Sequence, residues 1–291
     1  TKNTTEIAQD DAAASVEERH CAAHDVLLEE LAADPSLAAR HEEIERFTEA
    51  YISSNQVGER AIITIPVVFN VLYKTAAQNV SLAQLQSQID VLNADYAATN
   101  SDYNNAPALF QGVRAGDTEV RFVLHSVVRK STNKTSWTTS DAMKKSAQGG
   151  IAATTPTTKL NIWVCNMGGG ILGYAQFPGG SAATDGVVLD DNATGNTGTA
   201  AAPYGMGRTA THEVGHWMNL RHIWGDATCG SDLVNDTPTH NTSNGGCPAY
   251  PHYSTCAGAP VEMTMNYMDY TYDQCMYMFT LGQKSRMLAV F

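Results

Sequence analysis

The spacing of apolar and polar positions along the chain predicts strands that alternate with helices. The nearly continuous apolar run from Ile62 to Tyr73 is typical of a strand in a sheet that is covered on both faces. Between residues 81 and 96, apolar side chains recur at helical spacing, which predicts an amphipathic helix with Ser81 as its N-cap. The pattern also predicts strands at Val120–Val128 and Leu160–Cys165, a short edge strand at Gly173–Phe177, and helices at Thr209–Met218 and Gly282–Val290. This alternation predicts an α/β (α+β) fold with a mixed sheet and the helix at 209–218 packed beneath it.

The N-terminal segment differs from the rest of the chain. From Val16 to Ile52, a sparse apolar stripe recurs at helical spacing among charged residues, and Asp34-Pro35-Ser36 divides the segment into two helices. Its apolar surface is too small for a core of its own, so we expect it to pack against the larger domain. Because a polar connector follows at residues 53–59, the chain divides into a helical segment at 1–60 and a domain at 61–291. Within that domain, Gly179–Gly205 is rich in small and polar residues and is expected to form long loops.

The run from His212 to His222 reads HEVGHWMNLRH and carries the strongest chemical signal. A helix brings positions four apart onto one face, so His212 and His216 can offer two nitrogens to one ion. His222 lies too far along the chain for the same straight helix, and Asn219 is suited to end that helix because asparagine readily adopts the left-handed conformation. Three histidine ligands with an open fourth position are typical of a catalytic zinc. Glu213 would then take a proton from a water on the metal, whose pKa zinc lowers toward ~7.

Composition and charge narrow the class of protein. The 291 residues include 43% hydrophobic and 16% charged residues, an ordinary globular balance, and the length suggests about two domains. A net charge of −12 disfavours nucleic acid or an anionic membrane surface as a partner. No run of 18 apolar residues occurs, so no transmembrane helix is expected. The chain begins at Thr1 without an apolar leader, so we expect any signal peptide to have been removed or left out.

Six cysteines indicate an oxidising compartment, and therefore a secreted protein. Four of them lie in loop-like sequence, which predicts disulfides there, although six cysteines can pair in fifteen ways. Four cysteines could instead hold a second zinc, but the chain has no Cys-x-x-Cys pair to favour this. The four clustered residues are Cys229, Cys247, Cys256 and Cys275.

The motif HExxHxxGxxH, followed by a Met-turn in the run Asn266–Tyr270, resembles the metzincin clan of zinc endopeptidases. Within the clan, the chain is most similar to the pappalysin family and its ulilysin-like secreted members. Asn219 stands where the clan usually has glycine. The resemblance implies a mixed twisted sheet over the active-site helix, an upper subdomain at 61–218, and a loop-rich, disulfide-stapled lower subdomain at 219–291. It also implies that Met268 lies beneath the zinc, and that Tyr270 faces the site and stabilises the oxyanion.

Further expectations come from the resemblance. It implies disulfides Cys229–Cys256 and Cys247–Cys275, and a structural calcium, for which Asp232, Asp236 and Thr237 supply hard oxygens in one short loop. An Asx-rich turn without a metal remains open for that loop. The edge strand at 173–177 would align an extended substrate by main-chain pairing. Ulilysin-like enzymes favour a basic residue after the scissile bond, read by an aspartate directly before a family cysteine. Gln274 holds that place here, with Asp273 beside it, so we expect a weaker or broader preference.

Cys21 suggests how the enzyme is kept latent. A thiolate is a strong zinc ligand and can occupy the open fourth position, as in the cysteine switch of related zymogens. A Cys21–Cys165 disulfide and a bystander thiol are the alternatives. We therefore expect residues 1–60 to be a pro-segment that acts as an intramolecular inhibitor. Cleavage is expected near Glu59, Arg60 or Ala61.

These observations favour a secreted zinc endopeptidase that is made as a zymogen and cleaves proteins or peptides. A non-catalytic, secreted binding module stabilised by zinc is the main alternative, and a zinc amidase for small substrates is a third. Glu213 favours an enzyme, because a purely structural zinc site has no use for a free carboxylate.

Overall fold

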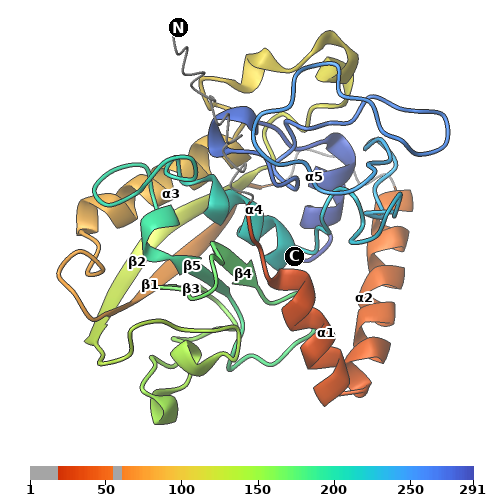
Figure 1. Cartoon of the computed structure of the whole chain (residues 1–291). Coiled ribbons are helices and arrows are strands. Elements are labelled where there is room, and N and C mark those ends of the chain that lie inside the picture. The colour runs from red at the N-terminus through yellow and green to blue at the C-terminus, as the bar shows by residue number, and fades with distance from the viewer. Residues whose placement is uncertain (1–18, 55–60) are drawn as a thin grey trace, which may run out of the picture.

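A five-stranded sheet organises the computed structural model, which describes residues 19–54 and 61–291 (Figure 1). The strand order is β2-β1-β3-β5-β4. All neighbouring strands pair in parallel except β4, which runs antiparallel to β5 at one edge. The strands are β1 (Ile63–Tyr73), β2 (Val120–Ser131), β3 (Leu160–Cys165), β4 (Gly173–Ala175) and β5 (Val187–Asp190). The predicted α/β fold with a mixed sheet is confirmed.

Both faces of the sheet are covered, as the apolar run of β1 predicted. Val67 and Val68 are neighbours on β1 that point to opposite faces, and both are fully buried. One face packs against α3 (Leu82–Tyr96) and α4 (Arg208–Trp217). Ser81 caps α3 as expected, because its side chain accepts a hydrogen bond from the backbone N–H of Gln84. The helix α4 lies under β4 and β5 and is the element that carries the histidine motif.

The opposite face of the sheet packs against the start of the N-terminal segment, its first helix and the loop between β2 and β3. The helices α1 (Ala23–Ala33) and α2 (Ser36–Ser53) lie side by side along one flank of the molecule (Figure 1). The guanidinium of Arg286 on α5 (Leu281–Leu288) donates two hydrogen bonds to the Glu45 carboxylate of α2. This helical segment therefore rests on the larger domain, as its small apolar surface predicted.

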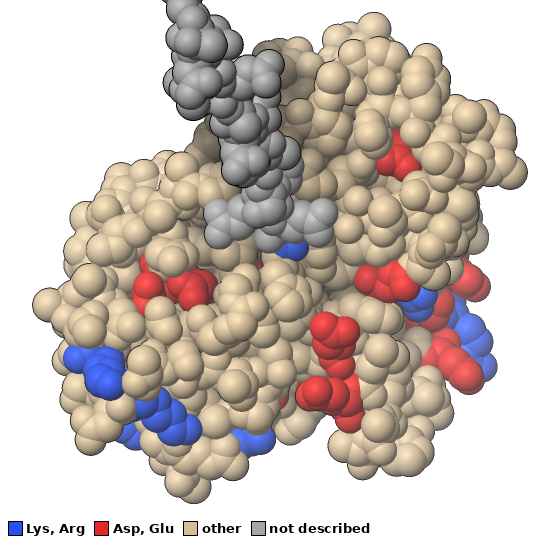
Figure 2. All heavy atoms as spheres, viewed as in Figure 1, with Lys and Arg blue, Asp and Glu red and all other residues tan. Residues whose placement is uncertain are grey.

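The chain after α4 forms mainly loops up to α5, as expected. Disulfides join Cys229 to Cys256 and Cys247 to Cys275, the two pairings that the family resemblance implied. Within the described part of the chain, no helix combines the length and the apolar content needed to cross a bilayer. Figure 2 shows acidic side chains over α1, acidic and basic ones together over α2, and basic ones near the far end of β2.

Several boundaries differ from the predictions. Gly179–Gly205 was expected to be loop throughout, yet it contains β5, a strand too short for its alternation to stand out. The strand β2 runs three residues past Val128, and α5 begins one residue before and ends two residues before the predicted limits. Short 3-10 helices were not predicted and occur at Tyr103–Asn105, Ala108–Val113, Ala142–Lys144, Ser146–Gln148, Asp191–Ala193 and Asp273–Cys275.

Candidate metal centre and active site

Three imidazole rings converge at the end of α4. The Nε2 atom of His216 lies 3.1 Å from Nε2 of His212 and 3.1 Å from Nε2 of His222. The helix ends at Trp217, and Asn219 adopts a left-handed φ of 69° in the turn that brings His222 back. The structure therefore brings together the three histidines that the sequence selected, by the helix ending predicted for Asn219.

Each ring is oriented through its other nitrogen. An acceptor bound to Nδ1 favours the tautomer that has its proton there, which leaves Nε2 free to bind a metal. His212 Nδ1 lies 2.7 Å from the backbone oxygen of Tyr267, His216 Nδ1 lies 2.7 Å from that of Leu220, and His222 Nδ1 contacts the carboxylate of Asp226.

Cys21 completes a group of four buried donors. One donor atom each from Cys21, His212, His216 and His222 lies within 4.8 Å of the other three. A tetrahedral zinc with ordinary bond lengths separates its nitrogen and sulfur ligands by about 3.3–3.6 Å. The spacing and the chemistry of these donors therefore fit zinc. Among the described residues, this is the one group of at least three His, Cys, Asp or Glu side chains with such spacing.

Burial sets the protonation of the site. Loss of hydration lowers the pKa of His216 to about 3 and lowers that of His212. Both rings are therefore neutral, as metal ligands must be. Burial also raises the pKa of Glu213 to about 8, and raises that of the Cys21 thiol, which donates to Glu213 Oε2 at 3.3 Å. Glu213 Oε1 is buried and has no hydrogen-bond partner among the described residues.

Met268 and Tyr270 both lie at the site. A Cβ atom on Gly215 would come within 2.6 Å of Met268 Sδ, so the Met268 side chain lies directly against α4 between the two helical histidines. The Tyr270 ring centroid lies 5.0 Å from that of His222. Its hydroxyl donates to the backbone oxygen of Cys21 at 3.0 Å.

The N-terminal segment pairs with the sheet edge above this site. The backbone N–H of Leu172 donates to the backbone oxygen of His20, and the N–H of Ala22 donates to the backbone oxygen of Gly173. Cys21 thereby forms a parallel β-bridge with Gly173. The expected edge strand is thus present, although its β-structure is limited to Gly173–Ala175. The pairing shows that this edge accepts an extended chain.

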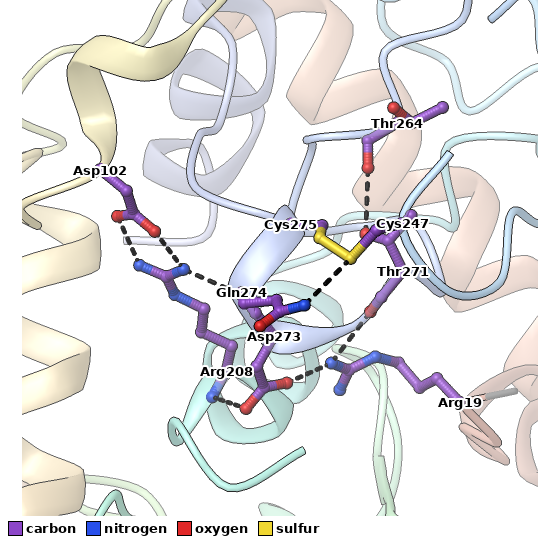
Figure 3. The surroundings of a disulfide bond; sticks show 9 residues. All are labelled: Arg19, Asp102, Arg208, Cys247, Thr264, Thr271, Asp273, Gln274 and Cys275. Carbon is purple, nitrogen blue, oxygen red and sulfur yellow. Dashed lines mark hydrogen bonds and ion pairs between the residues drawn. A yellow bond between two sulfur atoms is a disulfide. The ribbon is translucent and has the colours of Figure 1, made fainter. Parts of the chain in front are cut away.

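Asp273, and not Gln274, points inward, toward Arg19 and the start of α4 (Figure 3). The Asp273 side chain is fully buried, and its Oδ1 atom receives a hydrogen bond from Arg19 Nη2 at 2.5 Å. Its Oδ2 atom accepts the backbone N–H groups of Met206 at 2.9 Å and of Arg208 at 3.2 Å, where α4 begins. Gln274 is exposed, and its side chain contacts the sulfur of Cys247.

The three residues expected to bind calcium do not share one site. The Thr237 hydroxyl lies 2.9 Å from both carboxylate oxygens of Asp232. Asp236 instead turns to the start of α5, where it accepts hydrogen bonds from the Thr280 hydroxyl and the Gly282 N–H. Burial raises the pKa of Asp232 to about 6.

Cys165 is a free, buried thiol, and so is Cys21, so the alternative of a Cys21–Cys165 disulfide is wrong.

Four residues at the site were not predicted from the sequence. Arg19 could have been noticed two positions before Cys21, and Asp226 four positions after His222. The partner of Arg19 is distant in sequence, and Asp226 itself lies beyond the end of the histidine motif. The missed residues are Arg19, Arg208, Asp226 and, as a contact of Glu213, Gly173.

Comparison with known proteins identifies relatives of this chain. Residues 173–291 match the peptidase family model described as pregnancy-associated plasma protein-A. Extracellular metalloprotease 1 of Coccidioides posadasii (strain C735) is 34% identical over 240 residues, which cover 78% of this chain and 76% of the relative. An extracellular metalloprotease of Arthroderma benhamiae is 32% identical over 230 residues, covering 77% of this chain and 76% of that protein.

Two solved structures are also similar. Mature mirolysin of Tannerella forsythia, solved with a cleaved peptide, has a TM-score of 0.76 and 44% identity, and the match covers 79% of this chain and 91% of that one. A promirolysin variant of the same organism has a TM-score of 0.86 and 40% identity, with 94% of each chain covered. The match to the precursor thus extends over more of this chain than the match to the mature form.

Proposed function

The chain belongs to the pappalysin family of metallopeptidases, and from this premise we propose how its residues divide the work. It is a secreted zinc endopeptidase that is made as a zymogen. His212, His216 and His222 hold the zinc, and Glu213 is the general base. The observation that carries this assignment is the convergence of three Nε2 atoms next to a carboxylate oxygen that has no hydrogen-bond partner in the described part of the chain.

Each catalytic residue has a defined task. Bound zinc supplies a Lewis acid that polarises the peptide carbonyl and acidifies water. Glu213 takes a proton from the attacking water and returns it to the leaving amine, for which Oε1 is available. Tyr270 donates to the Cys21 carbonyl in the zymogen, and after that segment leaves, its hydroxyl can donate to the developing oxyanion. Met268 supports α4 from below.

The Glu213→Ala variant distinguishes the proposed zinc endopeptidase from the binding module and the small-substrate amidase. We expect proteolysis to be lost while one zinc per chain is retained, measured with a quenched fluorescent peptide and by metal analysis. Unchanged peptide cleavage in the variant would refute the role of Glu213. A wild-type protein that binds zinc but cleaves no peptide would favour the binding module, and one that cleaves only small amides would favour the amidase.

We infer that residues 1–60 are the pro-segment and that Cys21 is the fourth zinc ligand in the latent form. Residues 61–291 make up 231 of the 291 residues, or 79% of the chain, the share that mature mirolysin matches. The expected cleavage region includes Glu59 and Arg60, which lie outside the described residues, and the exposed Ala61. Cys21→Ala should shorten the time to self-activation; an unchanged lag would reject the cysteine switch.

We also propose that Asp273 selects a basic side chain after the scissile bond. In the zymogen, its buried carboxylate already binds the Arg19 guanidinium, so the pocket accommodates this chemistry. The weaker preference expected from Gln274 loses its basis, because Gln274 lies at the surface. Asp273→Asn should remove the preference in a peptide-library digest. A cleavage profile without enrichment of Arg or Lys in the wild-type enzyme would contradict this proposal.

Calcium remains a proposal that rests on Asp232 and Thr237. Asp232 is 4% exposed, its carboxylate lies 2.9 Å from the Thr237 hydroxyl, and that hydroxyl also contacts the Val234 carbonyl. These are oxygen ligands of the kind that Ca²⁺ prefers. Asp236 is assigned to the N-terminus of α5 instead.

A further inference from the structure

Arg208 links the buried carboxylate of Asp273 to a loop far away in the sequence (Figure 3). Arg208 is the first residue of α4. Its guanidinium donates to both carboxylate oxygens of Asp102, at 2.5 and 2.7 Å, and to the backbone oxygen of Asp273 at 2.8 Å. The Asn100 side-chain amide also donates to Oδ1 of Asp102, at 2.7 Å. The guanidinium therefore lies beside Asp273 but is turned toward Asp102.

The charges in this cluster do not cancel. Asp95 lies 3.6 Å from Arg208, so one guanidinium is shared by the carboxylates of Asp95 and Asp102, and it bonds Asp273 only at its backbone oxygen. In the zymogen, Arg19 supplies a second cation at Asp273 Oδ1. When the N-terminal segment leaves, the cluster keeps an excess of negative charge at a buried position. A basic substrate side chain would restore the balance, since buried charges require partners.

Asp102 decides which carboxylate Arg208 binds. A bidentate pair with a carboxylate is the strongest contact that a guanidinium makes, and here it fixes the side chain in one direction. Without the Asp102 charge, Arg208 would be drawn to the Asp273 side chain, whose backbone it already contacts. A guanidinium bound there would compete with any incoming arginine or lysine.

We propose that Asp102 and Arg208 are positioning residues that keep the Asp273 carboxylate free to bind a basic side chain. Among the described residues, neither side chain has a hydrogen bond or ion pair with His212, His216 or His222. Their effect on selectivity rests on the proposed role of Asp273, whereas their effect on Arg19 in the zymogen does not. The remote loop that carries Asp102 is thus part of the specificity machinery.

The first test measures selectivity in the mature enzyme. Two quenched peptides differ only in Arg or Leu after the scissile bond, and the ratio of their kcat/KM values is compared between variants. Asp102→Asn should lower this ratio by about tenfold while cleavage of the Leu peptide changes less than twofold. Asp273→Asn is the reference for complete loss. Asp117→Asn, which removes the carboxylate from an exposed pair with Arg121, is the matched control and should leave the ratio unchanged.

The second test measures how tightly Asp273 holds Arg19 in the zymogen, and it requires no catalysis. In an intact zymogen with Glu213→Ala and Cys165→Ser, Cys21 is the one cysteine outside the two disulfides, and its reaction with a thiol reagent reports release of the N-terminal segment. Asp102→Asn should accelerate this reaction about tenfold through weaker binding of Arg19. Arg208→Lys, which cannot form the bidentate pair, should do the same and serves if Asp102→Asn does not fold.

The outcomes are distinct. An unchanged reaction rate of the thiol together with an unchanged peptide ratio would overturn the proposal. Equal losses for the Arg and Leu peptides would also overturn it, because they would mean that the pair only supports α4. If the wild-type enzyme shows no preference for Arg, the proposed specificity fails, and the thiol reaction alone decides whether Asp102 acts on the pocket.

Discussion

Gly173→Ala is expected to displace the general base while leaving the zinc in place. A Cβ atom on Gly173 would lie 2.8 Å from the backbone oxygen of Val188, and 3.0 and 3.1 Å from Cγ and Oε1 of Glu213. Because favourable contacts between carbon atoms begin at about 3.5 Å, both neighbours are too close by about half an ångström. The backbone of Val188 is fixed by its sheet pairing, so residue 173 must shift away from the Val188 oxygen, and the Glu213 side chain that meets the same Cβ atom must move as well.

The size of the effect follows from these overlaps. Overpacking of this kind costs about 1–3 kcal/mol, which lowers the Tm of a domain of this size by about 2–12 °C. A catalytic group misplaced by about 1 Å costs up to about 100-fold in rate. We therefore expect kcat to fall by about 10- to 100-fold, with KM changed less than threefold.

The assay is steady-state cleavage of a quenched peptide by the mature enzyme, with zinc content measured on the same samples. Gly168→Ala is the control in the preceding turn, because its Cβ would meet Ser136 at an ordinary 3.4 Å. It should leave kcat unchanged. A Gly173→Ala enzyme with wild-type kcat would show that Glu213 is not held against β4, and the reasoning above would be wrong.

Three other perturbations test the structure away from the catalytic base. Glu45→Gln leaves the buried Arg286 guanidinium without its carboxylate and should lower the zymogen's stability by about 1–3 kcal/mol; thermal unfolding of the full chain checks this, and a variant as stable as the wild-type zymogen would contradict it. Replacing Cys229 and Cys256 by serine opens a crosslink with a sequence separation of 27, and should cost about 3.5 kcal/mol in urea unfolding; a loss below about 1 kcal/mol would disagree. Burial raises the folded-state pKa of Asp232 above its unfolded value, to about 6, so its contribution to stability is present below pH 4 and is lost as the pH rises through about 6. Asp232→Asn should remove this loss in calcium-free buffer, and calcium at pH 7 should raise the Tm of the wild-type protein but not of the variant; equal shifts in both would reject Asp232 as a ligand.

Elements whose apolar pattern continues over many residues were predictable from the sequence, whereas short elements were not. The strand β1 and the helix α3 each repeat their pattern over more than ten residues, so their existence and type follow from local sequence. The strand β5 has four residues and lies between glycine-rich loops, so its identity depends on pairing with β3 and β4. Tertiary contacts, not local preference, make it a strand.

The site likewise contains residues whose placement follows from local sequence and residues whose placement does not. His212, Glu213 and His216 are fixed relative to one another by helix geometry, and Asn219 signals the turn that returns His222. The Arg19–Asp273 pair spans 254 positions, so no local spacing can reveal it. The choice between Asp273 and Gln274 depended on which side chain points inward from a 3-10 helix, and the sequence does not contain that direction.

Through Arg286, removal of the N-terminal segment is expected to change the stability of the domain that remains. Arg286 is 1% exposed, and its guanidinium donates to the Asn219 carbonyl, which lies between His216 and His222 in sequence, and to the Glu45 carboxylate. Removal of the first 60 residues takes that carboxylate away and leaves a cation with diminished compensation next to the metal-binding turn. The active form is therefore expected to be less durable than its precursor. Such a protease carries a built-in limit on how long it works once it is released.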